Sequence, residues 1–585
     1  MTIGAQPGIR PRPVYCVVAA EHEDLELAEA VASGSFTHFG VTIEAGADPD
    51  WLSGDLPADE EWRIDWWKFG YGLDLAHAYA STGDERFKAT WSSLVDSFVR
   101  RVPVGRDSTE VAARRIQNWI YAWTMFDELP AELERRLFER IAAETLYVRD
   151  NLTPARNHRT LELYALFLVA LAFPSLDRRR VLLEFAVQEL HETLLVDFRP
   201  DGVHCEASTH YHVLALRSLF AARENARRFE LDLPAGFDDL LGRACEFALH
   251  CHRPDGVISA LSDGDNGSFL RLLELAADLL DRDDFRWVAS AGSRGTPPST
   301  RNADFPDGGY YFQRSGWGEN EPFRSERFLV LDCGPLGDGG HGHYDLLSVE
   351  IAAGGSPLVV DPGRYTYSEE PPNFRRWFKG TAAHNTVCVD RLDQTPYRLG
   401  RPKGSVAEGR FLQRKTTQDV DMLVARAVSP VYDALHTRRV VFVRGEYWLI
   451  EDRIEAASPH RLDLRFHLSP NAHGRTNVSG AFVRAPGIAL VVADPHRPSL
   501  EDGWVAASYG QKEPAPVVSV VAVGVYATFV TLVAPLRGRE VVPGLEVRAE
   551  GAATLCDVSW PTRRRRDRIS WTGEGGEARL VRRLG

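Results

Sequence analysis

In the first half of the chain, apolar side chains recur at the three- and four-residue spacing that is typical of amphipathic helices. The pattern starts at 62–79 and is broken by a polar Gly-containing turn at 81–84. About ten helices are predicted in all. The further segments, each followed by a turn signal, are 86–101, 109–127, 131–150, 158–173, 179–196, 207–229, 237–252 and 268–281. Helices joined by short turns indicate paired helices in a ring or solenoid, and the lack of a fixed sequence repeat disfavours a strict repeat array.

The pattern changes in the stretch 292–310, which starts with a linker rich in Gly, Ser and Pro at 292–299. Beyond it, short runs rich in Val, Phe, Tyr and Thr alternate with Gly and Pro turns. Examples are 328–331, 439–443, 462–468, 517–523 and 526–532. These runs predict a large antiparallel β domain of stacked sheets. The fold class is therefore α+β and multidomain, with a helical domain at 1–300 and a β domain at 301–585.

Composition narrows the class of protein without naming a reaction. The 585 residues are 44% hydrophobic and 26% charged, which is the ordinary globular range. This length predicts about four domains of average size, or two large ones. The net charge of −14 disfavours a nucleic-acid binder. A polyanionic substrate would need a local basic cleft.

Cysteine usage and the N-terminal region bear on the compartment. Seven cysteines are scattered singly, without a C-x-x-C pair, which disfavours a disulfide framework and a thiolate zinc site. The longest early apolar run, 14–20, is too short to span a membrane, and the acidic stretch 21–24 after it is not typical of a signal peptide. We expect a cytoplasmic protein that binds no membrane, or a secreted or periplasmic one if a signal was removed. Monomer and homodimer both stay open.

Four clusters of polar residues could carry chemistry. Each also has an ordinary structural interpretation: Asn157 could cap a helix, Tyr211 could be core, and His341 lies in a Gly-rich turn. No nucleophile elbow, Walker A loop or dinucleotide fingerprint occurs in a convincing context. The clusters are 156–159, 201–212, 339–345 with 359–363, and 375–386.

Three residues in the third and fourth clusters are candidate metal ligands. His343, Asp361 and His384 offer two imidazoles and a carboxylate, a set that suits a borderline metal such as zinc. Their spacing fits ligands on neighbouring strands, although many such trios occur by chance. The metal could be structural, or it could keep an open position and activate water.

At these clusters the chain resembles the heparinase II/III-like polysaccharide lyases, a superfamily that includes glycosaminoglycan and alginate lyases. The resemblance covers most of the chain and implies an incomplete (α/α) toroid followed by an antiparallel β-sandwich. Five motifs in order carry it: Asn157-His158, Glu206-x-Ser208-x-x-Tyr211-His212, His341-x-His343-x-Asp345, Asp361-Pro362-Gly363 and Ala383-His384-Asn385-Thr386.

The resemblance also implies roles for individual residues. Asn157 and His158 match a pair that contacts the uronate carboxylate, Tyr211 matches the catalytic tyrosine, and His341 matches a catalytic histidine of the β domain. The trio of candidate ligands matches a structural metal site, usually Zn²⁺, with Mn²⁺ or Ca²⁺ as alternatives. Candidate substrate contacts are Arg115, Trp119, Arg159, Glu206, His212 and Arg375.

The implied reaction is β-elimination at a uronic acid of an anionic polysaccharide. A base removes the C5 proton, donors such as Asn157 and His158 stabilise the charge that builds on the carboxylate, and an acid protonates the leaving oxygen. Tyr211 could do both proton transfers, or share them with a histidine. The expected substrates are heparan sulfate, chondroitin or hyaluronan, with alginate next. Alternatives are a uronyl C5-epimerase, a metal-dependent glycan hydrolase and a non-catalytic carbohydrate-binding protein.

Overall fold

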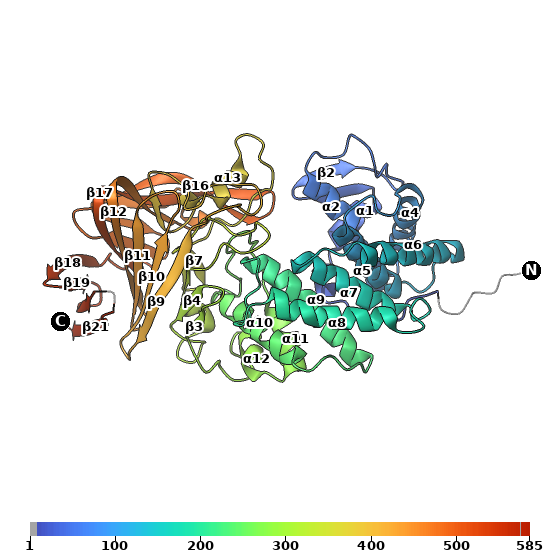
Figure 1. Ribbon diagram of the computed structural model, residues 1–585, viewed down its shortest axis with the longest axis horizontal. Helices are drawn as coiled ribbons and strands as arrows, with labels where there is room; N and C mark the ends of the chain where they lie inside the picture. The colour runs from blue at the N-terminus through green and yellow to red at the C-terminus, as the bar shows by residue number, and fades with distance from the viewer. Residues whose placement is uncertain (1–8, 574, 585) are drawn as a thin grey trace, which may run out of the picture. The chain divides into compact units, whose positions relative to one another are not determined.

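The computed structural model describes residues 9–573 and 575–584 and divides the chain into two compact units (Figure 1). We call them the helical unit, residues 1–198 and 214–242, and the sheet unit, residues 199–213 and 243–585. The predicted division at residue 300 therefore differs from the compact units, since the last helices of the N-terminal region belong with the sheets.

The described residues form twelve α-helices before the first strand of the large sheets. The predicted segments lie close to observed helices except at 62–79, where Phe69 adopts a left-handed conformation (φ 60°) and separates two helices. The first and last of the twelve, residues 25–32 and 283–289, were not predicted. The helices are α1 Leu25–Ala32, α2 Glu60–Lys68, α3 Tyr71–Thr82, α4 Glu85–Arg101, α5 Thr109–Met125, α6 Ala131–Asp150, α7 Arg156–Ala172, α8 Val181–Asp197, α9 Thr209–Arg228, α10 Phe237–Cys251, α11 Leu270–Leu280 and α12 Asp283–Ala289.

Local sequence explains where several of these helices begin. The side chains of Asp24, Asp59, Asp84 and Ser108 each accept a hydrogen bond from a backbone N–H of the first turn of α1, α2, α4 and α5. Such a cap satisfies a donor that the helix itself leaves unpaired. A small hairpin of β1 Ser35–His38 and β2 Val41–Glu44 also belongs to the helical unit.

The sheet unit is built from three antiparallel sheets. A five-stranded sheet runs β3-β4-β5-β6-β7. A ten-stranded sheet runs β13-β14-β15-β17-β12-β11-β10-β9, with β16 paired to β17 and β8 to β12, and a four-stranded sheet runs β18-β19-β20-β21. The strands are β3 Ala303–Phe305, β4 Tyr310–Arg314, β5 Arg327–Asp332, β6 Val349–Ala353, β7 Ser356–Val359, β8 Val387–Val389, β9 Glu408–Thr416, β10 Val420–Val428, β11 Leu435–Val443, β12 Tyr447–His467, β13 Asn477–Ser479, β14 Phe482–Ala485, β15 Ile488–Val492, β16 Pro498–Ser508, β17 Gln511–Pro535, β18 Gly544–Glu550, β19 Ala553–Trp560, β20 Arg565–Thr572 and β21 Arg579–Leu584.

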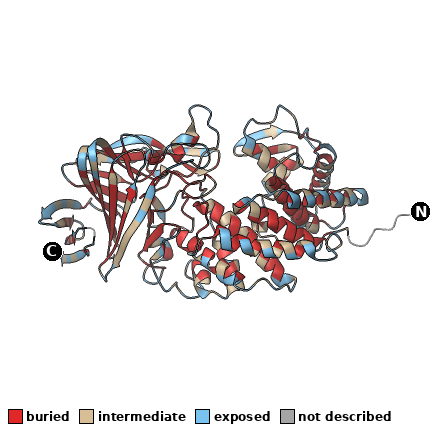
Figure 2. Cartoon of the chain, in the orientation of Figure 1, coloured by how far each residue is buried: buried red, intermediate tan, exposed pale blue. Residues whose placement is uncertain are grey.

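Each face of the ten-stranded sheet packs against another sheet. One apolar cluster joins it to the five-stranded sheet, with Leu329 and Ile351 against Leu464 and Phe529. A second cluster on the opposite face joins it to the four-stranded sheet through Trp560 and other residues. Figure 2 shows the buried positions running along these strands. The predicted order of a helical region followed by stacked antiparallel sheets is confirmed.

Two features refine the predicted β domain. The runs predicted separately at 517–523 and 526–532 form one long strand, β17, whose pairing with β12 shifts register between Glu455 and His460. A short helix, α13 Phe374–Lys379, interrupts the sheets and carries Arg375, one of the predicted substrate contacts, together with Arg376 and Lys379. In the described part of the chain, no helix combines the length and apolar character needed to cross a lipid bilayer.

Candidate active site and metal cluster

Tyr211 lies in the first turn of α9, and this turn is anchored within the sheet unit. The hydroxyl of Ser208 donates to the carbonyl of Asp263 (2.9 Å), and that of Thr209 donates to the carbonyl of Ser259 (2.6 Å). Both hydroxyls are buried. Tyr211 itself is 8% exposed, so its position is set by packing and by the partners of its phenol.

The Tyr211 phenol is surrounded by one ring, one hydroxyl and one guanidinium. Its ring stacks on the imidazole of His341, with centroids 3.7 Å apart. Its Oη lies 2.6 Å from Oη of Tyr367, and Arg364 Nη1 donates to both phenols (3.1 and 2.7 Å). Burial raises the pKa of Tyr211, and the positive charge of Arg364 opposes that rise without cancelling it. The phenol is therefore protonated at neutral pH.

His341 is the more accessible partner, with 19% of its side chain exposed. Its Nδ1 lies 3.0 Å from Oδ2 of Asp263 and its Nε2 lies 3.7 Å from Oε1 of Glu206. An ionised carboxylate can only accept, so Nδ1 carries a proton and donates it to Asp263. In the neutral imidazole, the lone pair is then on Nε2, which leaves that atom able to accept a proton.

Asp263 is fully buried and holds two histidines at once. Its Oδ2 accepts from His341, and its Oδ1 lies 2.9 Å from Nε2 of His343. Arg375 pairs with both of its oxygens. Burial alone would raise the pKa of Asp263, but the charge of Arg375 and the hydrogen bonds from both imidazoles outweigh burial and hold the pKa well below its ordinary value. The carboxylate is therefore ionised.

His341 and His343 lie in the turn 339–343, which we call the glycine turn. This turn needs glycine at two positions. At Gly340 the backbone has φ +96°, and an added Cβ would lie 2.5 Å from the backbone of Gly400. At Gly342 an added Cβ would lie 1.8 Å from the carbonyl oxygen of Leu336. Lys379 links the turn to the segment around Gly400, because its buried Nζ donates to the carbonyls of Gly340 (2.7 Å) and Gly400 (3.3 Å). Burial and the nearby Arg375 lower the pKa of Lys379 to about 8.

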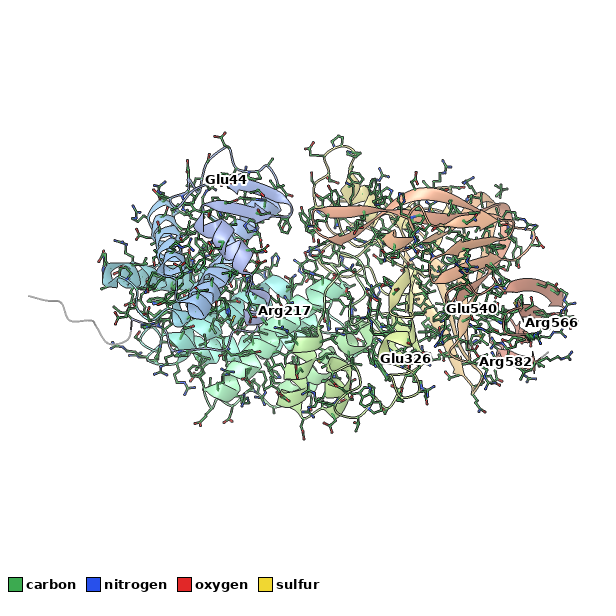
Figure 3. The ribbon with its side chains drawn as sticks, turned by 180° about the vertical axis from the view of Figure 1, so that it is seen from behind. Glu44, Arg217, Glu326, Glu540, Arg566 and Arg582 are labelled. Atoms are coloured by element: carbon green, nitrogen blue, oxygen red, sulfur yellow. The ribbon has the colours of Figure 1, made fainter. Side chains whose placement is uncertain are left out.

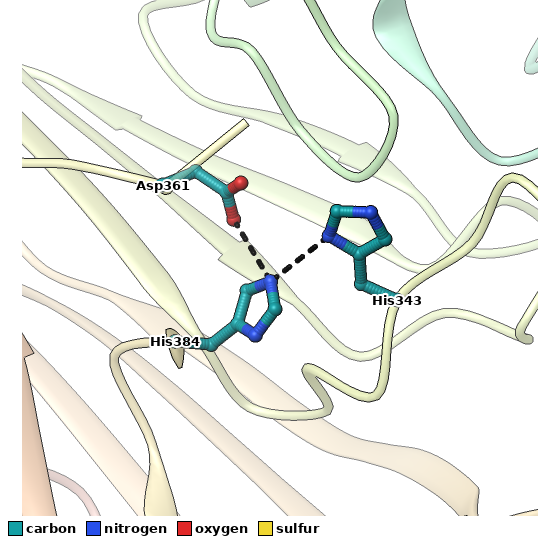
Figure 4. Close-up of side chains that lie close together, drawn as sticks. All are labelled: His343, Asp361 and His384. Carbon is teal, nitrogen blue, oxygen red and sulfur yellow. Dashed lines mark hydrogen bonds and ion pairs between the residues drawn. The ribbon is translucent and has the colours of Figure 1, made fainter. Parts of the chain in front are cut away.

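The three candidate metal ligands converge in the same part of the sheet unit (Figure 4). His343, Asp361 and His384 are buried, and one ligand atom from each lies within 4.8 Å of the other two. Nδ1 of His343 lies 3.1 Å from Nε2 of His384, which lies 3.8 Å from Oδ2 of Asp361. The chain brings them from the glycine turn, from the loop after β7 and from the segment before β8.

The hydrogen bonds around this cluster fit a cation. His343 donates from Nε2 to Asp263, and His384 donates from Nδ1 to the carbonyl of Gly380 (2.9 Å), so in the neutral rings both lone pairs point at each other. Burial lowers the pKa of both imidazoles, to about 4 for His343 and well below its usual value for His384. Two facing lone pairs lie beside the buried Asp361 side chain, whose pKa is raised by burial, and a bound cation would stabilise this arrangement. The donor set is one that zinc accepts.

Asn157 and His158 lie in the helical unit, at the start of α7. Asn157 is buried and His158 is exposed. The N-cap of α7 is Ala155, so Asn157 is already inside the helix and does not cap it. The backbone N–H of Arg156 donates to Asp197 (2.7 Å), which fixes the entry to the helix.

Several predicted substrate contacts have protein partners already. Arg115 is buried and pairs with Asp107 and Glu144, and Trp119 is buried against Phe69 and Phe98. The geometry gives both a packing role.

Four further residues were predicted as substrate contacts. Arg159 pairs with Glu189. His212 is buried, its Nε2 reaches the carbonyl of Ala244 (2.9 Å), and burial lowers its pKa to about 3. Glu206 and Arg375 do lie beside His341 and Asp263, but as buried residues that position them.

The structure adds residues that the sequence patterns did not single out. Asp263 orients both histidines, and Arg364 and Tyr367 contact Tyr211 directly. Asp265 holds Arg364 through two hydrogen bonds (2.9 and 2.7 Å). The run that follows Asp361-Pro362-Gly363 contains Arg364 and Tyr367, so proximity to a recognised motif was the available signal.

Two family models match the chain over most of its length. Residues 18–287 match the heparinase II/III N-terminus, and residues 297–572 match the heparinase II/III-like C-terminal domain. The chain belongs to the heparinase II/III-like family.

Individual relatives agree with this assignment. The chain is 22% identical to a heparin-sulfate lyase of Pedobacter heparinus over 74% of its own length and 66% of that enzyme's, just under two thirds. It is 21% identical to a heparin-sulfate lyase of Bacteroides stercoris, over 85% and 78% of the two chains. The crystal structure of heparinase III superposes with a TM-score of 0.78 at 16% identity, covering 100% of this chain and 92% of the other. At that identity, the likeness shows the fold.

Proposed function

We propose that this protein is a polysaccharide lyase that cleaves uronate-containing glycosaminoglycans by β-elimination. Heparan sulfate is the first candidate, because the curated relatives are heparin-sulfate lyases. Chondroitin, hyaluronan and alginate are the other candidates. The observation that carries the proposal is the stacked pair of Tyr211 and His341, in which a protonated phenol lies against an imidazole whose Nδ1 is held by Asp263.

This pair supports a division of the proton transfers. His341 Nε2 removes the C5 proton, since Asp263 fixes the tautomer and stabilises the imidazolium that forms. Tyr211 protonates the leaving oxygen on C4, because its phenol is protonated before reaction. Tyr367 and Arg364 donate hydrogen bonds to the phenolate that remains and so stabilise it.

Removal of the C5 proton builds negative charge on the adjacent carboxylate, so the reaction needs donors there. Asn157 and His158 are the proposed donors, on the basis of the family motif that they match. An amide adds a hydrogen bond without a charge, and an imidazole can donate in either protonation state. Replacement of Asn157 by Ala tests this role through a loss of kcat that exceeds any change in KM.

A divalent cation, Zn²⁺ in the first place and Mn²⁺ or Ca²⁺ otherwise, is proposed at His343, Asp361 and His384. It would supply positive charge between two imidazole lone pairs and tie together three segments of the sheet unit. His343 is fully buried and His341 is two residues away, so the proposed role of the site is to hold the glycine turn in place.

The test is ultraviolet absorbance during incubation with heparan sulfate, chondroitin, hyaluronan, alginate and polyglucuronate. A lyase generates a conjugated C4–C5 double bond, so absorbance rises with the right substrate and no water is consumed. A flat trace over the whole panel, with folded and metal-loaded protein, would refute lyase action on these polymers. Deuterium uptake at unchanged chain length would identify a C5-epimerase instead.

A further inference from the structure

The sheet unit contains a cleft that shares no residue with the Tyr211–His341 site. Its volume is about 540 Å³, within the range of ordinary ligand pockets. Turns from all three sheets form it: the start of β5, the β6–β7 turn, the segment after β12, the β14–β15 turn, the end of β17 and the β19–β20 turn. Its polar lining includes Arg327, Arg475, Arg537, Arg563, Ser469 and Asn471.

The lining is positively charged although the chain as a whole carries −14. Four arginines line the cleft against one carboxylate, that of Glu446. Carboxylates near the rim offset part of this charge: Glu321 pairs with both Arg327 and Arg537, and Glu540 pairs with Arg563. Arg327 and Arg537 therefore share one acidic partner, Glu321. Glu540 is labelled in Figure 3.

Arg475 is the least compensated of the four arginines. Within the described residues it forms no ion pair, and its guanidinium makes one long hydrogen bond, to the carbonyl of Asn471 (3.5 Å). Arg475 is exposed, and 71% of the Arg537 side chain is exposed. Both guanidinium groups are therefore accessible to an anion from solvent, although Arg537 would exchange its ion pair with Glu321.

The chemistry of the lining favours an acidic sugar chain. A guanidinium is planar and binds carboxylate or sulfate through two parallel hydrogen bonds. The arginines come from four separate elements, which suits several anionic groups along a chain better than one small ion. Ser325, Ser356, Ser469 and Asn471 can pair with sugar hydroxyls. The cleft as described has no aromatic side chain in its lining, whereas single-stranded nucleic acid is usually held by stacking.

We infer that this cleft is a secondary binding site for an anionic polysaccharide, which it holds through the uronate and sulfate groups of a chain segment. The choice of a glycosaminoglycan as ligand rests on the function proposed above, whereas the capacity to bind a polyanion rests on the cleft alone. The site adds affinity for long chains and takes no part in proton transfer.

The test is a titration with size-defined heparan sulfate chains on Tyr211→Phe protein, so that the glycan stays intact. The double substitution Arg475→Glu with Arg537→Glu should weaken binding of long chains about tenfold, because two charge-assisted contacts become repulsive. The matched control is Arg497→Glu, an exposed arginine outside the cleft. In the wild-type background, turnover of a tetrasaccharide should be unchanged by the double substitution.

Hydrogen–deuterium exchange locates the contact directly. Long chains should protect residues 470–488 in Tyr211→Phe protein and should not protect them in the double variant. Unchanged affinity together with no protection would overturn the inference. Protection by inorganic sulfate as strong as that by the chains would also overturn it, since the cleft would then take single anions. Neither readout needs cleavage, so a failure of lyase activity would appear separately, in the absorbance panel.

Discussion

His341 and His343 are two residues apart and share the carboxylate of Asp263, yet their surroundings differ. His341 is partly exposed and stacks on a phenol, and its Nε2 lies 3.7 Å from a carboxylate oxygen of Glu206. His343 is fully sealed, and its lone pair faces another imidazole and a carboxylate. The same side chain is thus suited to accepting a proton on one side of the turn and to the proposed metal coordination on the other. Burial and hydrogen-bond partners decide this difference, because the residue type is the same.

The largest effect is expected at Tyr211, which stacks on the partly exposed His341. Tyr211→Phe should lower turnover about 10³-fold, since general acid catalysis typically contributes 10² to 10⁴, while the melting temperature changes little. Ultraviolet absorbance of the unsaturated product measures it. The matched control is Tyr397→Phe, whose hydroxyl contacts Glu369 outside the site. Retained activity in Tyr211→Phe would remove the phenol from the mechanism.

Metal removal tests the buried cluster of His343, Asp361 and His384. At a metal concentration a thousandfold above Kd, a bound ion should stabilise the fold by about 4 kcal/mol, and His384→Gln should abolish that gain. Thermal unfolding with Zn²⁺, Mn²⁺ and Ca²⁺ in turn, with and without chelator, measures it. If all three ions shift wild type and His384→Gln equally, the cluster does not hold the metal. Water activation, by contrast, would make chelation stop turnover while unfolding stayed the same.

Lys379 connects the turn of both histidines to the 400-region loop, and its pKa gives a pH test. In the unfolded chain the ordinary pKa is 10.5, and in the fold it is about 8. Between these values the unfolded state binds more protons, so stability rises with pH in this window. Relative to Lys379→Met, the wild type should gain on the order of 2 kcal/mol from pH 8 to 10.5. Denaturant unfolding at each pH measures the two stabilities. If they change with pH in the same way from pH 8 to 10.5, the pKa of Lys379 is not lowered in the fold.

The smallest effect is expected from replacing Arg364, whose charge acts on the Tyr211 phenol. Because its charge opposes the rise in the pKa of Tyr211, Arg364→Gln should raise that pKa further and make the phenol a weaker acid. The loss in kcat/KM should be about tenfold, or 1.4 kcal/mol. Arg376→Gln, on an exposed position of α13, is the control. Unchanged kcat/KM in Arg364→Gln would mean that Arg364 does not stabilise the phenolate of Tyr211.

Periodicity located most elements well and their breaks less well. The helix predicted at 131–150 matches α6, since a regular apolar stripe continues from end to end. The break at Phe69 escaped notice because the aromatic positions on either side keep helical spacing through it. The length of β17 was hidden by Gly524, which reads as a turn but lies within the paired strand.

The site could be predicted where its residues form short motifs. Tyr211, His341 and the three candidate ligands were each placed by a motif, and the structure brings these five together within the sheet unit. Asp263 was not predicted, because its role depends on contacts with His341, His343 and Arg375 that are 78 to 112 positions away. A single aspartate carries no local sign of such partners.

The glycine at position 342 has a consequence for anyone who tries to alter this protein. A β-carbon there would overlap the carbonyl of Leu336, so the stretch between the two histidines can be neither filled nor, without moving them, lengthened. In a randomised library, this codon should therefore return glycine almost without exception, and new specificities will have to be sought in the loops around the turn.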